Sequence, residues 1–263
     1  MTFADYAALP GINASLLKLA RKSALHYHYF SEHEVPDSPA MFKGRYMHCC
    51  VLEPDEFPKK YTVWPEVRRG NAWLEFAAAS EDAGMEVLTR AEYDDALTVR
   101  DAVRAHPVAS KYLSEGEPEV TVQWTDPDTG LACKGRPDWL RPGLLISLKT
   151  SERIDHRNFE RTTHDFGYHI SEAHYVNGLQ LTRGGEWQVK FIAVESKPPH
   201  DVRCGPLSDD ALWAGQQEVK RLLRLVKDCT ESGIWPGAYP DESEFDLPPW
   251  FYAQGERELE GLA

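Results

Sequence analysis

The stretch that decides the fold is GRPDWLRPGLLISLK, which runs from Gly135 to Lys149. A proline followed by a glycine, Pro142-Gly143, divides it, and this dipeptide is typical of a tight turn. Apolar residues rich in leucine and isoleucine follow the turn. The pattern therefore predicts a hairpin of two strands, one over residues 131–140 and one over residues 144–150.

The hairpin carries residue types that suit the hydrolysis of phosphodiester bonds. Such a reaction needs carboxylate oxygens to hold Mg²⁺, an activated water and a cation near the developing charge. Side chains two apart on a strand share a face, so Ser147 and Lys149 look into one site, which Asp138 can reach across the hairpin. Asp138 and Lys149 supply one carboxylate and the cation. Glu119, on a neighbouring strand, is the natural second carboxylate, and His48 can add a ligand or a phosphate contact.

A motif this short also has a purely structural interpretation. The letters GRPD are compatible with an ordinary turn, and a lysine near a strand end is usually solvated. Context favours a site, because the motif falls on two strands joined by a short turn, with a carboxylate on a third strand and a helix after them.

Composition places the chain among globular proteins. Its 263 residues suit one large domain, and 42% of them are hydrophobic and 27% charged. We expect no membrane span and no secretion, hence a cytoplasmic protein, because neither a long apolar run nor a basic-then-apolar leader occurs. The five cysteines have no CxxC spacing, which favours reduced thiols over a zinc site.

The net charge of −13 counts against nucleic acid as a partner, since affinity for DNA comes mostly from neutralising phosphates. Net charge is a sum over the whole surface, however, and a local basic groove is compatible with it.

Along the chain the pattern changes from helical to sheet-forming near Gly116. The first part predicts helices with capping residues at their starts, and Tyr61 to Arg69 reads as irregular. These helices run from Asn13 or Ser15 towards Tyr29, from Ala40 to Leu52, and from the capping box at Thr89 and Glu92 to about Ala105. The second part predicts strands over 119–124, 131–140, 144–150, 187–196 and 201–204, and helices over 168–181 and from Ser208.

This order predicts an α/β fold in one domain over residues 1–263. We expect a mainly helical N-terminal elaboration over 1–115, a catalytic α/β core over 116–230 and a C-terminal tail over 231–263.

The hairpin resembles a known family. Cys133 to Asp138, followed by Ile146 to Thr150, is similar to the C-terminal nuclease domain of RecE-like exodeoxyribonuclease VIII, in the PD-(D/E)XK nuclease superfamily. The other matching segments occur in the same order, from about Leu9 to Tyr252. They are Gly44 to His48 with Val51 to Pro54, Tyr168-His169 with Ala173 and Tyr175, Phe191 to Glu195, and Trp235-Pro236.

The resemblance implies a PD-(D/E)XK core, a central mixed sheet flanked by helices. It also implies a Mg²⁺-dependent exonuclease, with Mn²⁺ able to substitute, that degrades double-stranded DNA ends from 5′ to 3′. Such enzymes are encoded by bacteria, phages or prophages, form homo-oligomeric rings (trimer or tetramer), and work beside a RecT-like single-strand annealing protein in recombination. By position, the metal ligands are His48, Glu119 and Asp138, and Lys149 is the catalytic lysine.

The sequence departs from the family pattern at two positions. The family has an acidic residue where Ser147 stands, and a serine hydroxyl is a poor Mg²⁺ ligand. It also often has glutamine where Ser171 stands, four residues before Tyr175. Three explanations of Ser147 remain open: an engineered inactivation, a substitute carboxylate such as Glu172, or a degenerate DNA-binding relative. On a helix Glu172 points about 100° away from Ser171, which puts its reach in question.

DNA contacts are expected from basic residues that flank the site, namely Lys43, Arg45 and Arg136, and from the family positions Ser171 and Tyr175. Arg68, Arg69 and Trp73 either guide a strand or form a solvated loop with one packed aromatic. The leading hypothesis is thus a DNA exonuclease. The alternatives are a catalytically impaired DNA-end-binding or oligomeric scaffold on the same fold, and an endonuclease of restriction or repair type.

Overall fold

The centre of the molecule is a five-stranded mixed sheet with strand order β3-β6-β7-β8-β9. The computed structural model describes residues 3–248 and 250–252. Within the sheet, β7 and β8 are parallel, whereas β6 and β9 are antiparallel to their neighbours β7 and β8. The bounds are β3 (Glu117–Pro118), β6 (Trp139–Arg141), β7 (Leu144–Ser151), β8 (Gln188–Glu195) and β9 (Val202–Pro206).

The other elements surround this sheet. Two further strand pairs are β1 (Tyr61–Trp64) with β2 (Glu86–Thr89), and β4 (Val122–Thr125) with β5 (Ala132–Gly135). The helices are α1 (Phe3–Ala8), α2 (Ala14–Leu19), α3 (Ala24–Glu32), α4 (Pro39–Leu52), α5 (Phe57–Lys60), α6 (Gly70–Asp82), α7 (Arg90–Ala105), α8 (Pro107–Tyr112), α9 (His156–Asp165), α10 (Tyr168–Arg183) and α11 (Asp209–Ser232).

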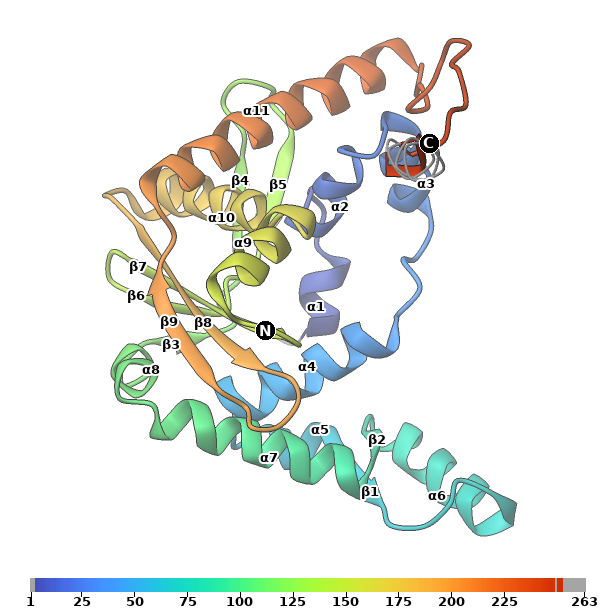
Figure 1. The fold of residues 1–263 in the computed structure, drawn as a ribbon, viewed down its shortest axis with the longest axis vertical. Coiled ribbons are helices and arrows are strands. Elements are labelled where there is room, and N and C mark those ends of the chain that lie inside the picture. Colours follow the sequence, from blue (N-terminus) through green and yellow to red (C-terminus); the bar gives the residue numbers. More distant parts are fainter. Residues whose placement is uncertain (1–2, 249, 253–263) are drawn as a thin grey trace, which may run out of the picture.

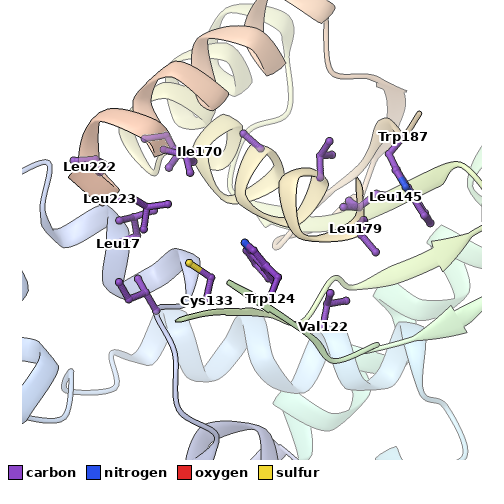
Figure 2. Close-up of a cluster of buried hydrophobic side chains, with 14 of the residues drawn as sticks. Leu17, Val122, Trp124, Cys133, Leu145, Ile170, Leu179, Trp187, Leu222 and Leu223 are labelled. Carbon is purple, nitrogen blue, oxygen red and sulfur yellow. The ribbon is translucent and has the colours of Figure 1, made fainter. Parts of the chain in front are cut away.

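Helices cover both faces of the sheet (Figure 1). On one face Leu145 packs with α10 and α11 in the apolar cluster of Figure 2. On the opposite face Ile146 and Leu148 pack with residues of α4 and α7. Because side chains alternate along a strand, Ser147 and Lys149 lie on the α10 face together with Leu145. This arrangement confirms the predicted α/β class, with a central mixed sheet flanked by helices.

The β4–β5 hairpin packs on α10 through Trp124, which Figure 2 shows pointing towards that helix. A Cβ added at Gly178 would lie 2.5 Å from the Trp124 ring, so the helix offers a glycine where the indole approaches. His174, one turn earlier, is buried. Its Nε2 lies 3.1 Å from Ile12 O and 3.3 Å from Lys134 O, which ties α10 to the N-terminal segment and to β5.

Several helices begin where the sequence predicts. The side chain of Asn13 accepts a backbone N–H of α2, and Ser208 does the same for α11. Thr89 and Glu92 form a complete capping box at the start of α7. These side chains satisfy N–H groups that the first turn of a helix leaves unpaired.

Other elements differ from the prediction. The first helix does not continue towards Tyr29, because α2 ends at Leu19 and Ser23 caps a separate helix, α3. The segment Tyr61–Arg69, expected to be irregular, begins with β1, which pairs in parallel with β2. Between those strands α6 extends away from the body of the molecule (Figure 1). Neither α6 nor α9 was predicted.

The strand predicted over residues 131–140 is broken into β5 and β6. Arg136-Pro137-Asp138 lies between them, and a proline cannot donate to a strand ladder. The strand predicted over 119–124 is also broken, since Glu119 has a φ of 53° and lies between β3 and β4. Both carboxylates predicted for the site therefore stand at breaks in strands.

The predicted tail begins against α3. Trp235 stacks on His28, with ring centroids 4.6 Å apart, and on Tyr27 at 5.8 Å. Residues 249 and 253–263 of the predicted tail lie outside the described residues. All five cysteines are free. Among the described helices, none combines the length and the apolar character needed to cross a bilayer.

Candidate metal centre

Three predicted ligands converge at one edge of the sheet. His48 comes from α4, Glu119 from the segment between β3 and β4, and Asp138 from the residue before β6. One ligand atom of each side chain lies within 4.8 Å of the corresponding atoms of the other two. All three side chains are partly buried.

The backbone around the strand breaks positions the two carboxylates. Glu119 N donates to Asp138 O at 3.0 Å, so the two segments are held side by side. Asp138 Oδ2 accepts the backbone N–H of Leu148 at 2.8 Å, which fixes the carboxylate against β7. His48 Nδ1 lies 4.0 Å from the same oxygen.

Lys149 lies between two carboxylates. Its Nζ is 3.7 Å from Asp138 Oδ2 and 3.4 Å from Glu172 Oε1. The ammonium group also lies 5.1 Å from the centroid of the Tyr168 ring. Tyr168 and Glu172 are four residues apart on α10, so they share the helix face that covers Lys149.

Glu172 reaches the position at which the hairpin lacks an acidic residue. Ser147 Oγ is 2.7 Å from Glu172 Oε1 and 3.1 Å from Asp138 Oδ2. Glu172 is completely buried, and its second oxygen, Oε2, has no hydrogen-bond partner among the described residues. The angle between Glu172 and Ser171 leaves the reach of Glu172 open; in the structure Glu172 faces the site, and Ser171 faces away and donates to Gly167 O at 3.4 Å.

The protonation states follow from burial and from charge. Burial raises the pKa of Glu119, and the negative charge of Asp138 raises it further against the effect of Arg136. Burial lowers the pKa of His48, which keeps its imidazole neutral and able to act as a ligand.

The pKa values of Lys149 and Glu172, deeper in the site, are set by burial as well as by their mutual attraction. Burial acts to lower the pKa of Lys149, but Asp138 and Glu172 outweigh it and hold this pKa above its usual value. Burial raises the pKa of Glu172, and Lys149 opposes that effect. Two carboxylates, Asp138 and Glu172, thus face one lysine, which leaves negative charge for a further cation to balance.

Three of the residues predicted to contact DNA, Arg136, Ser171 and Tyr175, have side chains that are largely buried. Arg136 Nε is 2.8 Å from Glu119 Oε2, and the arginine side chain is only 9% exposed. Ser171 is buried. The Tyr175 ring packs under Gly135, where an added Cβ would lie 2.7 Å from it. These residues therefore support the site from within.

Lys43 and Arg45 are both ion-paired. Lys43 Nζ is 2.8 Å from Asp95 Oδ2 and donates to a backbone carbonyl. Arg45 Nη2 is 2.9 Å from Asp37 Oδ2 and 2.9 Å from Glu86 Oε1. A DNA phosphate at either position would compete with an acidic partner.

The sequence reasoning missed two residues beside Lys149. Lys18, on α2, donates from Nζ to Phe166 O at 3.0 Å. Burial and the charge of Lys149 lower the pKa of Lys18 to about 8. No local pattern marks Lys18, because only the packing of α2 against α10 brings it there. Tyr168 had a usable signal in its four-residue spacing to Glu172.

The residues present fit a divalent cation. An imidazole and two carboxylates are ligand types that Mg²⁺, Mn²⁺ and Zn²⁺ accept in proteins, with hard oxygens favouring Mg²⁺ and Mn²⁺. Burial, and then the negative charge of Asp138, raise the pKa of Glu119, and a bound cation would oppose both effects by stabilising the ionised carboxylate. Chemically, the arrangement can hold a cation beside a permanently charged lysine, which suits attack on a phosphodiester.

Comparison with known proteins places the fold. A "Putative exonuclease" from Eubacterium rectale has a similar structure, with a TM-score of 0.61 and 15% identity over 94% of this chain and 95% of that chain. A phage related exonuclease from Haemophilus somnus aligns with a TM-score of 0.39 and 13% identity, over 88% of this chain and 100% of that chain. No curated protein matches. The family model described as a PDDEXK-like domain of unknown function (DUF3799) matches residues 13–243, and the chain belongs to this family.

Proposed function

We propose that this protein is a metal-dependent exonuclease that degrades one strand of linear double-stranded DNA from 5′ to 3′. The observation that carries the proposal is the convergence of His48, Glu119 and Asp138 within 4.8 Å, with Lys149 Nζ 3.7 Å from Asp138. The PD-(D/E)XK-like family supports it, because an aspartate and a lysine such as Asp138 and Lys149 are among the residues after which that superfamily is named.

His48, Glu119 and Asp138 would hold Mg²⁺, for which Mn²⁺ can substitute. When bound, the cation lowers the pKa of a water and stabilises negative charge on the phosphate. Lys149 stays protonated because two carboxylates face it, so it offers a fixed positive charge beside the reacting phosphate. Leu148 N and Ser147 Oγ, both bonded to Asp138, hold that carboxylate in place.

Glu172 takes the place of the acidic residue that position 147 lacks. Its carboxylate lies next to Ser147 Oγ and faces Lys149, and its other oxygen has no partner in the part of the chain that the structure describes. A buried oxygen without a partner is costly unless a cation or a proton satisfies it. Glu172 therefore completes the charge balance of the site from α10.

The biological setting follows from the RecE-like resemblance. We propose a cytoplasmic protein of bacterial, phage or prophage origin that forms a homo-oligomeric ring of three or four subunits around DNA and works with a RecT-like annealing protein. The net charge of −13 fits a ring whose exterior is acidic and whose basic residues face the channel.

Incubation with linear and circular duplex DNA in Mg²⁺ tests the activity. We expect nucleotides to be released from linear duplex only. A label placed at the 5′ end of a strand should be released first, because digestion runs from 5′ to 3′. Lys149→Met should abolish release, whereas Lys197→Gln, an exposed lysine paired with Glu152, should not. Nicking of circles would instead indicate an endonuclease.

A second candidate function is a DNA-end-binding or oligomeric scaffold without catalysis. The observation that favours it is Ser147, because a hydroxyl replaces a carboxylate at the centre of the site. Binding to DNA ends without nucleotide release in either Mg²⁺ or Mn²⁺ would establish the scaffold and reject the nuclease.

A further inference from the structure

A cavity lies beside the candidate metal centre, between α9, β9 and the start of α11. Its volume is about 450 Å³. Phe159, Phe191 and Ala193 line its apolar side, and His169 and Arg203 line its polar side. Figure 1 shows α9 beside β8 and β9, with α11 following directly from β9.

The sheet register relates this cavity to Lys149. Lys149 pairs with Ala193 on β8, and Ala193 pairs with Arg203 on β9. Paired residues on neighbouring strands point to the same face, so Lys149 and Arg203 lie on one face about 10 Å apart, two strand spacings. The centroid of the Tyr168 ring lies 5.1 Å from Lys149 Nζ and 6.3 Å from the ring centroids of Phe159 and Phe191, which line the cavity. Tyr168 thus contacts both the lining of the cavity and the lysine of the candidate metal centre.

The lining combines ring surfaces with hydrogen-bond donors. The rings of Phe159 and Phe191 meet edge to face, with centroids 5.9 Å apart. Arg203 Nη1 donates to Ile154 O at 3.2 Å, which orients the guanidinium. Its other N–H groups have no partner in the part of the chain that the structure describes. His169 Nδ1 lies 3.3 Å from a backbone carbonyl of α9, which leaves Nε2 for a ligand.

This chemistry selects the kind of ligand. A planar heteroaromatic ring gains from contact with phenylalanine and histidine faces, and a phosphate gains from the planar fork of an arginine. A molecule that carries both groups at a separation of a few ångströms is a nucleotide. An apolar peptide side chain would leave the free N–H groups of Arg203 without partners.

We propose that this cavity binds a deoxynucleoside 5′-monophosphate, with its base against Phe159 and Phe191 and its phosphate on Arg203. The proposal rests on the proposed function, since an exonuclease would generate this ligand near Lys149, which lies about 10 Å from Arg203 on the same face of the sheet. The nucleotide is either the terminal residue of the strand being degraded or the product after its release.

Calorimetric titration of the full, metal-free chain with dAMP and with deoxyadenosine tests the site. Arg203→Gln should weaken dAMP binding about tenfold or more and leave deoxyadenosine binding unchanged, because it removes charge-assisted bonds to phosphate. Ala214→Trp, at an exposed lining position, should abolish binding of both by filling the cavity. Arg183→Gln is the matched control, because Arg183 lines a different cavity of about 450 Å³.

Equal dAMP affinity in all four proteins would overturn the proposal, as would binding of an apolar dye without binding of dAMP. Thermal unfolding checks that Ala214→Trp remains folded, and Arg203→Gln provides the independent variant. Both measurements record binding and do not depend on nuclease activity. If the protein degrades DNA but these substitutions leave dAMP binding unchanged, the cavity proposal fails and the proposed function stands. If the protein binds dAMP in this cavity but releases no nucleotides from DNA, the proposed nuclease function fails and the binding site stands.

Kinetics separate the two sources of the nucleotide. If the cavity holds released product, dAMP should inhibit the wild-type enzyme and not Ala214→Trp. If it holds the terminal residue, Ala214→Trp should raise the KM for DNA ends. An Ala214→Trp enzyme with unchanged KM and unchanged inhibition by dAMP contradicts both forms.

Discussion

Ser147 on β7 and Glu172 on α10 are joined by a contact of 2.7 Å between Oγ and Oε1. A hydroxyl has one proton to donate, yet Ser147 lies within hydrogen-bond distance of two carboxylates, Glu172 and Asp138. The three side chains therefore act as one unit, and a change in any of them alters the charge balance around Lys149.

The first prediction concerns this pair. Ser147→Asp alone should not raise activity, because it places a second carboxylate against Glu172 in a buried site, where like charges repel. Glu172→Gln should lower the rate of nucleotide release about tenfold or more, as expected when a group that orients a site residue is lost. The double variant Ser147→Asp with Glu172→Gln should recover most of the loss.

Nuclease rates and thermal unfolding of the four proteins measure this coupling. A large gain in activity from Ser147→Asp alone would instead identify Ser147 as a lesion. Activity unaffected by Glu172→Gln would remove Glu172 from the mechanism.

The second prediction concerns Lys149. Lys149→Met should reduce the rate at least about 100-fold, because it removes fixed positive charge from the site of reaction. It should also lower the free energy of unfolding by about 3 kcal/mol, because it leaves Asp138 and Glu172 buried without their cation. The loss of stability should shrink as the pH falls, since burial raises the pKa of Glu172 and protonation of that carboxyl removes its unpaired charge. Denaturant unfolding at two pH values measures both effects.

The third prediction concerns cation binding. Mg²⁺ or Mn²⁺ at about 100 times its Kd should stabilise the folded chain by about 2.7 kcal/mol. Asp138→Asn should abolish that gain, because the carboxylate faces both His48 and Lys149. Glu115→Gln is the control, since the Glu115 side chain is 80% exposed. Unfolding with and without EDTA measures the gain, and equal stabilisation of Asp138→Asn would contradict the assigned ligands.

Residues that follow local rules could be predicted, whereas those brought together by packing could not. The capping box at Thr89 and the shared face of Ser147 and Lys149 depend on short-range geometry, and the structure has both. The reach of Glu172 depends on how α10 packs over β7. The angles between residues on one helix do not give this packing. Lys18 enters the site through α2, far away in sequence.

The strand breaks illustrate a second limit. Alternation predicted continuous strands through Glu119 and through Asp138, but the proline at position 137 and the positive φ of Glu119 interrupt them. A carboxylate at a strand break can turn towards a ligand. A carboxylate within a regular strand is less free to turn, because the backbone hydrogen bonds of the sheet fix its direction. Features that weaken a strand prediction thus coincide here with the candidate site.

The fourth prediction concerns the contact between Gly178 and Trp124. Gly178→Ala should destabilise the fold by about 1–3 kcal/mol, because its Cβ would lie 2.5 Å from an indole packed in the core. Gly205→Ala is the matched control, since no atom lies within 4 Å of its added Cβ. Denaturant unfolding of both variants measures the difference. Equal stability would show that the β4–β5 hairpin can shift away from α10 at little cost.

The last prediction concerns the buried His174. Burial lowers its pKa from 6.5 to about 4, against the opposing effect of the carbonyls of Ile12 and Lys134. The unfolded chain therefore binds a proton between about pH 6.5 and pH 4 that the folded chain does not, so the stabilising contribution is complete above pH 6.5 and is lost as the pH falls towards 4. The loss amounts to about 3 kcal/mol. His174→Gln, which keeps an N–H donor, should remove this part of the pH dependence, whereas the exposed His156→Gln should not. Unfolding free energies measured from pH 4 to pH 7 give the two profiles, and parallel curves for wild type and His174→Gln would contradict a neutral, buried His174.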